Sequence, residues 1–382
     1  AELNPQLASL SGPARARAVL LLAESHHQQQ RYGQAQELYR QLIDAYPDNP
    51  YRTNARYGLA WVDYRTSRYR AAAQAFAQVQ AAPQLSDSLR LQAAYHEAAS
   101  RSQAGEPQEA LRLYRTFSRT WPSSALADDA LYEAALLHYQ AERYGDAAQT
   151  LTALLDRYPA SERLGTAYYW LGNAQLAQKN LNAALDAYTQ ATERDAAPDS
   201  VLQEVRFQKA WAQYEGGQYA ASASAFASLA QGAPNTQRGR DALFWAADSH
   251  YQTGNYNRAR DLLLRYLNTY PSGRRAPAAQ YVLGWTYFEQ EQYRPAARAF
   301  RRFLDSNAPE DDAIPYRKDA RLRLADSYFA LADTVTTQVD ELEDAVGPDS
   351  GQDILQRISD TRRNVVFLRR YLAYAFDAVN NI

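Results

Sequence analysis

The chain has 382 residues with 41 basic and 43 acidic side chains, and its formal net charge of −2 gives no overall field that would attract nucleic acid or an anionic membrane. It contains no Cys, which excludes disulfides, thiolate nucleophiles and most structural zinc sites. No apolar run approaches the roughly 18 residues of a membrane-spanning helix, so we expect no membrane span.

The first twelve residues carry no helical periodicity, and we expect residues 1–12 to form an N-terminal tail. The chain contains no Met, even at position 1, and begins Ala1-Glu2-Leu3. We therefore expect a processed form or a fragment, with a start compatible with signal-peptide cleavage. Pro13 is expected to begin the first helix, because proline is favoured in a first helical turn.

A short helical pattern then restarts eight times, at intervals of 37 or 38 residues. Each start is marked by a residue, most often Tyr, that stands three positions before a small residue. The markers are Tyr32, Tyr69, Pro107, Tyr144, Leu181, Tyr219, Tyr256 and Tyr293, and the small residues are Ala35, Ala72, Ala110, Ala147, Ala184, Ser222, Ala259 and Ala296. A fixed period of about 20 to 50 residues is typical of repeat architectures, in which each unit buries its apolar face against its neighbours.

The stretch from Thr166 to Pro198 shows one repeat most clearly. Its apolar residues recur at spacings of three and four, which is the period of an amphipathic helix. They are Tyr168, Leu171 and Ala174, followed by Leu181, Ala184, Leu185, Tyr188 and Ala191. The polar residues 178–180 separate the two sets, so we predict two antiparallel helices joined by a tight turn, the second ended by Pro198.

Two bulky positions accompany the small residue of each repeat. Seven residues after each marker stand Tyr39, Phe76, Tyr114, Leu151, Tyr188, Phe226, Leu263 and Phe300, and twelve residues before it stand Leu20, Tyr57, Tyr95, Tyr132, Tyr169, Phe207, Phe244 and Tyr281. A small residue lets two helices approach closely. The bulky apolar residue seven positions after the marker is expected to fill the core between the helices.

These repeats resemble the tetratricopeptide repeat (TPR), as in YWLGNAQLAQKNLNAALDAY at residues 169–188 and VLGWTYFEQEQYRPAARAF at residues 282–300. The resemblance extends over about residues 14–309. It implies an all-α, right-handed superhelical solenoid of stacked antiparallel helix pairs, with eight pairs across residues 13–309. It also implies a non-enzymatic scaffold for protein–protein interaction.

The period exceeds the usual 34 residues of this family by about three, and the extra residues follow the second helix. There the chain reads AYPDNPYRTNA from Ala45, TWPSSALADDA from Thr120, RYPASERLGTA from Arg157 and TYPSGRRAPAA from Thr269. These aromatic-Pro turns are similar to those of bacterial envelope proteins, such as the outer-membrane barrel-assembly lipoprotein and the periplasmic coordinator of the Tol-Pal system. The resemblance implies a periplasmic, outer-membrane-associated or extracellular location, while a cytoplasmic one stays open.

The repeat pattern fails after Pro309, and we treat residues 310–382 as a C-terminal cap. We expect a ninth helix of the first type from Tyr316 to about Thr334. An acidic run from Asp340 to Asp353 should then form a solvated loop, since it lacks the spacing of a calcium-binding loop. A last helix from about Asp353 to Asn380 has an apolar stripe that would dock on the array or meet a partner. The stripe is Ile354, Ile358, Val365, Leu368, Leu372, Phe376 and Val379.

No residues suggest catalysis, a metal or a cofactor. The histidines are His26, His27, His96, His138 and His250, and none forms an HExxH pair. No Gly-rich phosphate loop, GxSxG turn or Ser/His/Asp arrangement occurs. We expect no cofactor, no nucleic-acid partner and no enzymatic activity.

In TPR proteins the first helix of each pair lines a concave groove, and the resemblance assigns that groove to positions 15, 12, 8, 5 and 4 residues before each marker. The groove reads as aromatic and mildly acidic. The candidate binding residues are Tyr57, Trp61, Tyr64, Tyr95, Tyr132, Tyr139, Tyr169, Asn173, Phe207, Trp211, Tyr214, Phe244, Tyr251, Tyr281, Trp285 and Phe288.

Such a groove suits an extended peptide, a basic or neutral protein segment, or a glycan, because Tyr and Trp bury large areas and keep a polar edge. It lacks the inward Lys and Asn with which the clamp type of TPR holds a C-terminal carboxylate. We predict a protein-binding scaffold. The alternatives are head-to-tail self-association into filaments, a polysaccharide-binding accessory module, or aromatics that only pack adjacent repeats together.

Overall fold

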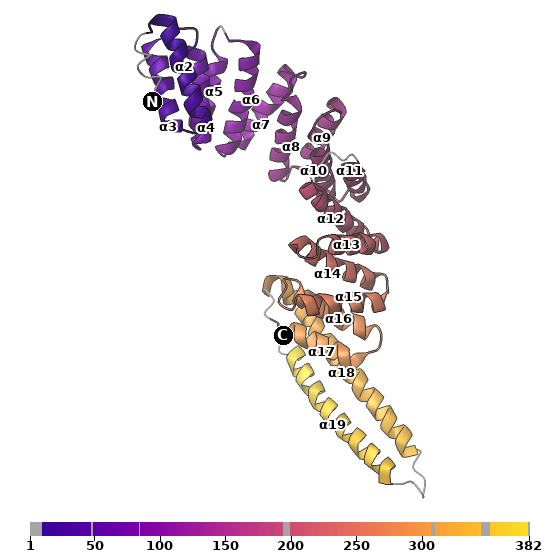
Figure 1. Ribbon diagram of the computed structural model, residues 1–382. Coiled ribbons are helices and arrows are strands. Elements are labelled where there is room, and N and C mark those ends of the chain that lie inside the picture. The colour runs from indigo at the N-terminus through magenta and orange to yellow at the C-terminus, as the bar shows by residue number, and fades with distance from the viewer. Residues whose placement is uncertain are drawn as a thin grey trace. The chain divides into compact units, whose positions relative to one another are not determined.

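The computed structural model describes residues 10–46, 49–83, 85–193, 199–306, 310–344 and 352–380. Within these ranges all regular secondary structure is helical and comprises eighteen helices, α2 to α19 (Figure 1). The all-α fold class predicted from the repeats is confirmed. The chain divides into two compact units, residues 1–201 and residues 202–382, which are described in turn.

Five antiparallel helix pairs make up the first unit, and each helix packs on the one that follows it. The pairs are α2 (Gly12–Gln28) with α3 (Tyr32–Ala45), α4 (Arg52–Arg65) with α5 (Tyr69–Gln80), α6 (Asp87–Gln103) with α7 (Pro107–Thr120), α8 (Ala127–Gln140) with α9 (Tyr144–Arg157), and α10 (Leu164–Ala177) with α11 (Leu181–Glu193). The second helix of every pair begins at a marker residue.

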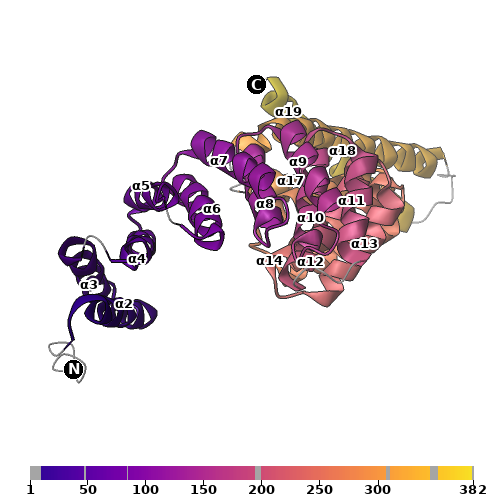
Figure 2. The ribbon, with the colours of Figure 1, turned by 90° about the horizontal axis from the view of Figure 1, so that it is seen from above.

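Four further pairs make up the second unit. They are α12 (Asp199–Glu215) with α13 (Tyr219–Gly232), α14 (Gln237–Gln252) with α15 (Tyr256–Thr269), α16 (Ala276–Phe288) with α17 (Tyr293–Leu304), and α18 (Glu310–Asp344) with α19 (Gln352–Asn380). The last pair differs from the others in the length of its helices, and α18 and α19 lie side by side (Figures 1 and 2).

The small residue of each repeat lies at the closest approach of the helices. All eight small residues, from Ala35 to Ala296, are 0% exposed. The bulky residues seven positions after the markers are at most 2% exposed, which confirms that they form the core. The sequence pattern therefore predicts these two buried columns correctly in both units.

The first helix of a pair also contributes a small residue where a bulky partner lies against it. A Cβ atom built on Gly172 of α10 would lie 2.4 Å from the ring of Tyr188 on α11, and one on Gly284 of α16 would lie 2.7 Å from the ring of Phe300 on α17. Such distances are well below van der Waals contact. Glycine is therefore required at these two positions for the ring to lie flat against the backbone.

The turn inside each of the first eight pairs contains one residue in the left-handed conformation, two positions before the marker. These residues are Gln30, Ser67, Gly105, Glu142, Lys179, Gly217, Gly254 and Glu291, with φ between 57° and 75°. The amide that follows bonds back to the carbonyl five residues earlier, as from Arg143 N to His138 O at 2.9 Å, which closes the first helix in a Schellman motif. The same turn geometry forms whether or not the residue is glycine.

The aromatic-Pro turns between pairs are linked to one another. Tyr158 donates its hydroxyl to the carbonyl of Pro122 at 2.8 Å, and Tyr270 donates to the carbonyl of Pro234 at the same distance. Each bond joins residues 36 positions apart, so it connects one inter-repeat turn to the next. These bonds give the aromatic residue of the turn a structural role.

The C-terminal region differs from its prediction at α18. The helix spans Glu310–Asp344 and not about Tyr316–Thr334, because no Gly or Pro occurs between residues 335 and 344 and Val339 is buried. Asp340 and Asp344 are therefore helical and not part of a loop. The rest of the expected acidic loop, residues 345–351, lies outside the described residues, as do residues 1–9 of the expected N-terminal tail.

The stripe predicted for the last helix packs along α18. Ile358 is buried, Val365, Leu368 and Leu372 are half-buried, and Phe376 is 58% exposed. The side chains of the other two stripe residues, 354 and 379, lie outside the described residues. No described helix contains an apolar stretch of the length needed to cross a bilayer. That residues 310–382 act as a cap stays a prediction.

Two glycine substitutions test the helix contact. We expect Gly172→Ala to destabilise the protein by about 1–3 kcal/mol, because the added methyl group overlaps the Tyr188 ring. Gly145→Ala is the matched control. Its Cβ would lie no closer than 3.6 Å to a neighbour, so it should leave stability unchanged or raise it by up to about 1 kcal/mol. Urea denaturation followed by circular dichroism measures both, and equal shifts of the two midpoints would contradict the contact.

Candidate functional site

The structure separates the sixteen predicted groove residues into two groups. Four are buried and offer little surface to a ligand: Tyr132 at 8%, Asn173 at 8%, Phe207 at 7% and Phe244 at 3% exposed. Asn173 uses its side-chain oxygen to accept the hydroxyl of buried Tyr188 at 2.7 Å. Neighbouring side chains cover these four residues, so they present little surface, and their role in binding stays a prediction.

The other twelve predicted residues are half-buried, on the first helices of both units. In the first unit, Trp61 of α4 is the centre of one cluster. Its ring lies 5.6 Å from that of Tyr64 and 6.4 Å from that of Tyr57 on the same helix, and 4.4 Å from that of His96 on α6. Tyr57 also donates its hydroxyl to Gln92 on α6 at 3.0 Å. The predicted aromatics thus hold α4 to α6 as well as facing outward.

The sequence pattern did not predict that His96 belongs to this cluster. The imidazole contacts the rings of Trp61, Phe76 and Tyr95, and burial among them lowers its pKa to about 4. The histidine is therefore neutral at pH 7 and acts as an aromatic packing residue. Its position, eleven residues before the marker, is the signal that could have identified it.

Trp170 and Trp245 occupy the same repeat position, and the sequence analysis did not include them either. The ring of Trp245 on α14 lies 4.6 Å from that of Trp211 and 5.2 Å from that of Tyr214, both on α12. Trp211 and Tyr214 are themselves stacked, with an interplanar angle of 10°. In the first unit Trp170 lies 5.0 Å from Tyr139 in the same manner. An aromatic residue at this position contacts groove residues of the preceding repeat, one for Trp170 and two for Trp245.

Three arginines cover the buried aromatic residues of the preceding repeat. Arg163 lies 5.1 Å from the ring centre of Tyr132, Arg238 lies 4.5 Å from that of Phe207, and Arg275 lies 5.7 Å from that of Phe244. The distances favour cation–π attraction. These arginines stand eighteen residues before a marker, a position that the groove assignment omitted.

Each of these arginines also binds an acid that the sequence analysis placed in the groove. Arg163 binds Asp129 at 2.7 Å, Arg238 binds Glu204 at 2.6 Å, and Arg275 lies 3.5 Å from Asp241, which is only 5% exposed. We call these three groups, each of an arginine, an acid and a ring, the arginine latches. The acids in the latches are neutralised within the chain, so the described surface is less acidic than the sequence suggests.

Other carboxylates remain on the same face in the second unit. Burial raises the pKa of the Tyr251 hydroxyl, and the nearby carboxylates of Glu289, Asp248 and Asp319 raise it further. Asp248 lies on α14 and Asp319 on α18, and Glu289 caps the C-terminus of α16. Asp248 is buried, accepts the hydroxyl of Tyr214, and has a raised pKa because it is desolvated. Asp319 accepts the hydroxyl of Tyr281 at 2.7 Å and the indole N–H of Trp285 at 3.1 Å.

The first unit has a similar but smaller acidic area. Burial raises the pKa of Glu133 on α8, and Asp129 raises it further, while Arg163 lowers it. Glu133 and Asp129 in turn raise the pKa of the Tyr95 hydroxyl, beyond the increase that burial causes. Half-buried tyrosines next to carboxylates therefore occur in both units.

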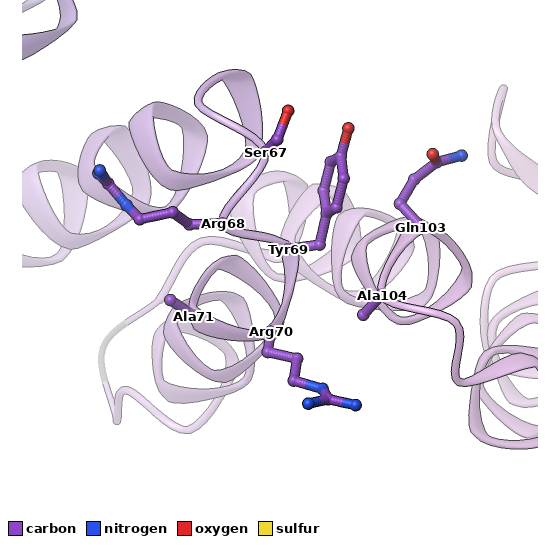
Figure 3. A pocket seen from close by; sticks show the side chains of 7 residues that line it. All are labelled: Ser67, Arg68, Tyr69, Arg70, Ala71, Gln103 and Ala104. Atoms are coloured by element: carbon purple, nitrogen blue, oxygen red, sulfur yellow. The ribbon is translucent and has the colours of Figure 1, made fainter.

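A hollow of about 420 Å³ lies at the turn between α4 and α5 (Figure 3). It is lined by Ser67, Arg68, Tyr69, Arg70, Ala71, Gln103 and Ala104, none of which is a predicted groove residue. Arg68 and Arg70 of its wall already bind Asp63 and Glu106. Among the described residues no cluster of His, Asp and Glu could hold a metal ion.

Comparison with known families assigns most of the chain. Residues 15–84, residues 95–162 and 132–201, and residues 204–236 match models described as tetratricopeptide repeat. Residues 236–318 match a model described as outer membrane lipoprotein. No curated protein matches the chain.

Two solved structures share the fold. The C-terminal part of a TPR repeat-containing protein from Cytophaga hutchinsonii is 16% identical with a TM-score of 0.52, over 68% of this chain and 98% of that one. A signal transduction ATPase with a tetratricopeptide repeat sensor, from Pyrococcus horikoshii, is 15% identical with a TM-score of 0.52, over 81% of this chain and 52% of that one.

The stacked helix pairs and their half-buried aromatic surface define a helical repeat scaffold for protein–protein interaction. Repeat matches cover both units. The chain belongs to the tetratricopeptide repeat family, and its residues 236–318 resemble an outer-membrane lipoprotein of that kind.

One latch can be tested by removing its arginine. We expect Arg275→Ala to destabilise the protein by about 1–3 kcal/mol, because it leaves buried Asp241 without its cation and uncovers Phe244. Arg274→Ala is the control, since this exposed neighbour should change stability by less than about 0.5 kcal/mol. Equal stabilities of the two variants in urea denaturation would show that the latch is not stabilising.

His96 should make stability depend on pH. Its folded pKa of about 4 lies below the ordinary value of 6.5, so the unfolded chain binds a proton more readily. Stability is therefore fully present above pH 6.5 and is lost as the pH falls toward 4. We expect His96→Phe, which keeps a ring in the cluster, to lose less stability than wild type over this range. Denaturation at a series of pH values measures it, and identical slopes would refute the assignment.

Proposed function

We propose that this TPR protein is a non-enzymatic scaffold that holds a basic, extended segment of a partner protein against the first helices. The observation that carries the proposal is the set of half-buried Tyr and Trp side chains next to carboxylates, of which Glu289 is exposed and, with Asp248 and Asp319, raises the pKa of the Tyr251 hydroxyl. Carboxylates that raise the pKa of a neighbouring phenol would equally favour an incoming ammonium or guanidinium group. Half-buried Tyr and Trp side chains next to them supply apolar contact area at a low cost in conformational entropy.

The arginine latches explain why a basic partner fits better than a glycan. A sugar ring stacks on an open aromatic face. Arg163, Arg238 and Arg275 already lie over aromatic faces, and Arg323 lies 4.6 Å from the ring centre of Trp285. The edges and hydroxyl groups that stay accessible are better suited to a peptide with cationic side chains.

We further propose that the protein works in the bacterial cell envelope. The match of residues 236–318 to the outer membrane lipoprotein model supports this location. The aromatic-Pro turns at Tyr158 and Tyr270, whose hydroxyls join successive turns, are the sequence feature that first suggested it. Fractionation of cells that express the protein, followed by immunoblotting, tests the location.

Charge reversal tests the proposed binding face. Glu215 and Glu289 are exposed, four residues before the markers of their repeats. We expect the double change Glu215→Lys and Glu289→Lys to reduce the recovery of basic partner proteins from envelope extract roughly tenfold at low salt, because two favourable charges become repulsive. Mass spectrometry of proteins retained by the immobilised full chain measures the loss.

The matched control is Asp261→Lys, which reverses an exposed charge on the second helix α15. It should retain the same partners as wild type. Circular dichroism of all three proteins establishes that they are folded. If wild type and the double variant recover the same proteins, the partner binds to another surface and the proposed binding face is wrong.

A further inference from the structure

The helix pair of α18 and α19 exposes more large apolar side chains than the rest of the second unit. Every strongly exposed large hydrophobic residue described in that unit lies on these two helices: Tyr316, Leu322, Phe329, Val366, Phe367 and Phe376. Phe329, Val366 and Phe367 are 63%, 68% and 60% exposed. Large apolar side chains exposed together on adjoining helices mark an interaction surface.

The side on which the two helices pack together can be recognised from a seven-residue spacing. Ala325, Ala332 and Val339 are buried on α18, and residues 358, 365 and 372 are buried or half-buried on α19. This spacing is that of two helices packed side by side along a seam. Ala320 of α18 contributes instead to the core formed with α17. The exposed residues therefore lie on other sides of both helices.

The exposed side of α18 combines an aromatic residue with acids. Phe329 lies between Asp326 and Asp333, at spacings of three and four residues, so the three side chains share one helix face. Asp333 is exposed, and Asp326 binds Arg323 of the same helix at 2.9 Å. Nearby Leu322 is 45% exposed, which extends the apolar part of this face by two turns.

The outer side of α19 combines an aromatic residue with arginines. Phe367 lies between Arg363 and Arg370, at spacings of four and three residues, on the side opposite the seam. Both arginines are exposed. Arg363 lies 3.7 Å from Asp360 across solvent, a contact of little energetic weight.

The two faces are complementary when the helices run antiparallel. Read backwards along α18, the order is Asp333, Phe329 and Asp326, at spacings of four and three. Read forwards along α19, the order is Arg363, Phe367 and Arg370, at the same spacings. An antiparallel contact therefore places each arginine opposite an aspartate and one phenylalanine opposite the other. The two faces of a single chain cannot meet, because α19 packs on α18 through its opposite side.

We propose that the α18–α19 pair is a self-association surface, on which the outer face of α19 from one copy of this chain binds the acidic face of α18 from a second copy. A contact of about three helical turns buries less than the roughly 1,200 Å² of a stable interface, so the association is weak and concentration-dependent. Its ion pairs are exposed and make it weaker at high salt. The surface adjoins the proposed partner-binding face around Tyr251, because Asp319 stands seven residues before Asp326 on α18, but its two phenylalanines lie beyond that face.

Sedimentation velocity over a concentration series, at low salt, tests the proposal with the full chain. Wild type should show a sedimentation coefficient that rises with concentration. Asp333→Arg and Arg363→Asp should each weaken the association about tenfold or more, because like charges then face each other. A chain that carries both changes should recover it, since every contact again joins opposite charges. An equimolar mixture of the two single variants should also associate.

Arg298→Asp, on the exposed side of α17, is the charge-matched control and should associate like wild type. Phe329→Ala and Phe367→Ala should each weaken association without a change of charge. A wild type that stays monomeric throughout would overturn the proposal, as would association that the single charge reversals leave intact or the double change fails to restore. The proposal would also be overturned if the monomer bound phosphatidylserine vesicles and Arg370→Asp abolished that binding. The outer face of α19 would then be a membrane-binding surface.

Discussion

The close approach of the two helices in each pair is the contact on which the rest of this structure depends. A small residue on the second helix is completely buried in all eight repeats, and a ring or leucine four residues later fills the space beside it. Where the ring lies flattest, as with Tyr188, the facing residue is Gly172 and a single added methyl group would overlap it. Because no repeat has a complete core of its own, the first helices within each unit also pack on the pair before them. The aromatic residues on those first helices are the consequence of that second requirement.

The sequence period was sufficient to predict which residues form this core, because burial in a repeat follows from register alone. The buried small and bulky columns needed no knowledge of partner side chains. The exposure of the predicted groove residues could not be read from register, for a physical reason. Register places Tyr132, Phe207 and Phe244 on the outward side of their helices, but it does not show that an arginine from the following repeat covers each ring. Contacts of that kind join residues 31 positions apart, at a repeat position without a conspicuous pattern.

The same long-range contacts change the electrostatics of the surface. Asp129, Glu204 and Asp241 count as negative charges in the sequence, yet each is paired with a latch arginine in the fold. The acidic side chains that are not paired within the chain are therefore a better guide to partner binding than the total number of acids in the sequence. Around Tyr251, Glu289 is exposed, whereas Asp248 is buried and Asp319 lies 3.7 Å from Arg323. Position relative to neighbouring repeats, and not composition, determines which acids can attract a partner.

The last helix pair, α18 and α19, differs from the earlier pairs in how its helices end and how they are covered. Every earlier first helix ends after about three to five turns at a residue in the left-handed conformation. α18 has no such residue within its described length and continues to Asp344, so that its second half extends beyond the helix that it covers. Only α19 packs along that extension, which leaves the remaining sides of both helices without a repeat to bury them. The large exposed apolar residues of the second unit occur there because the repeat that buries such residues elsewhere has ended. Those side chains are therefore available for contacts with other molecules.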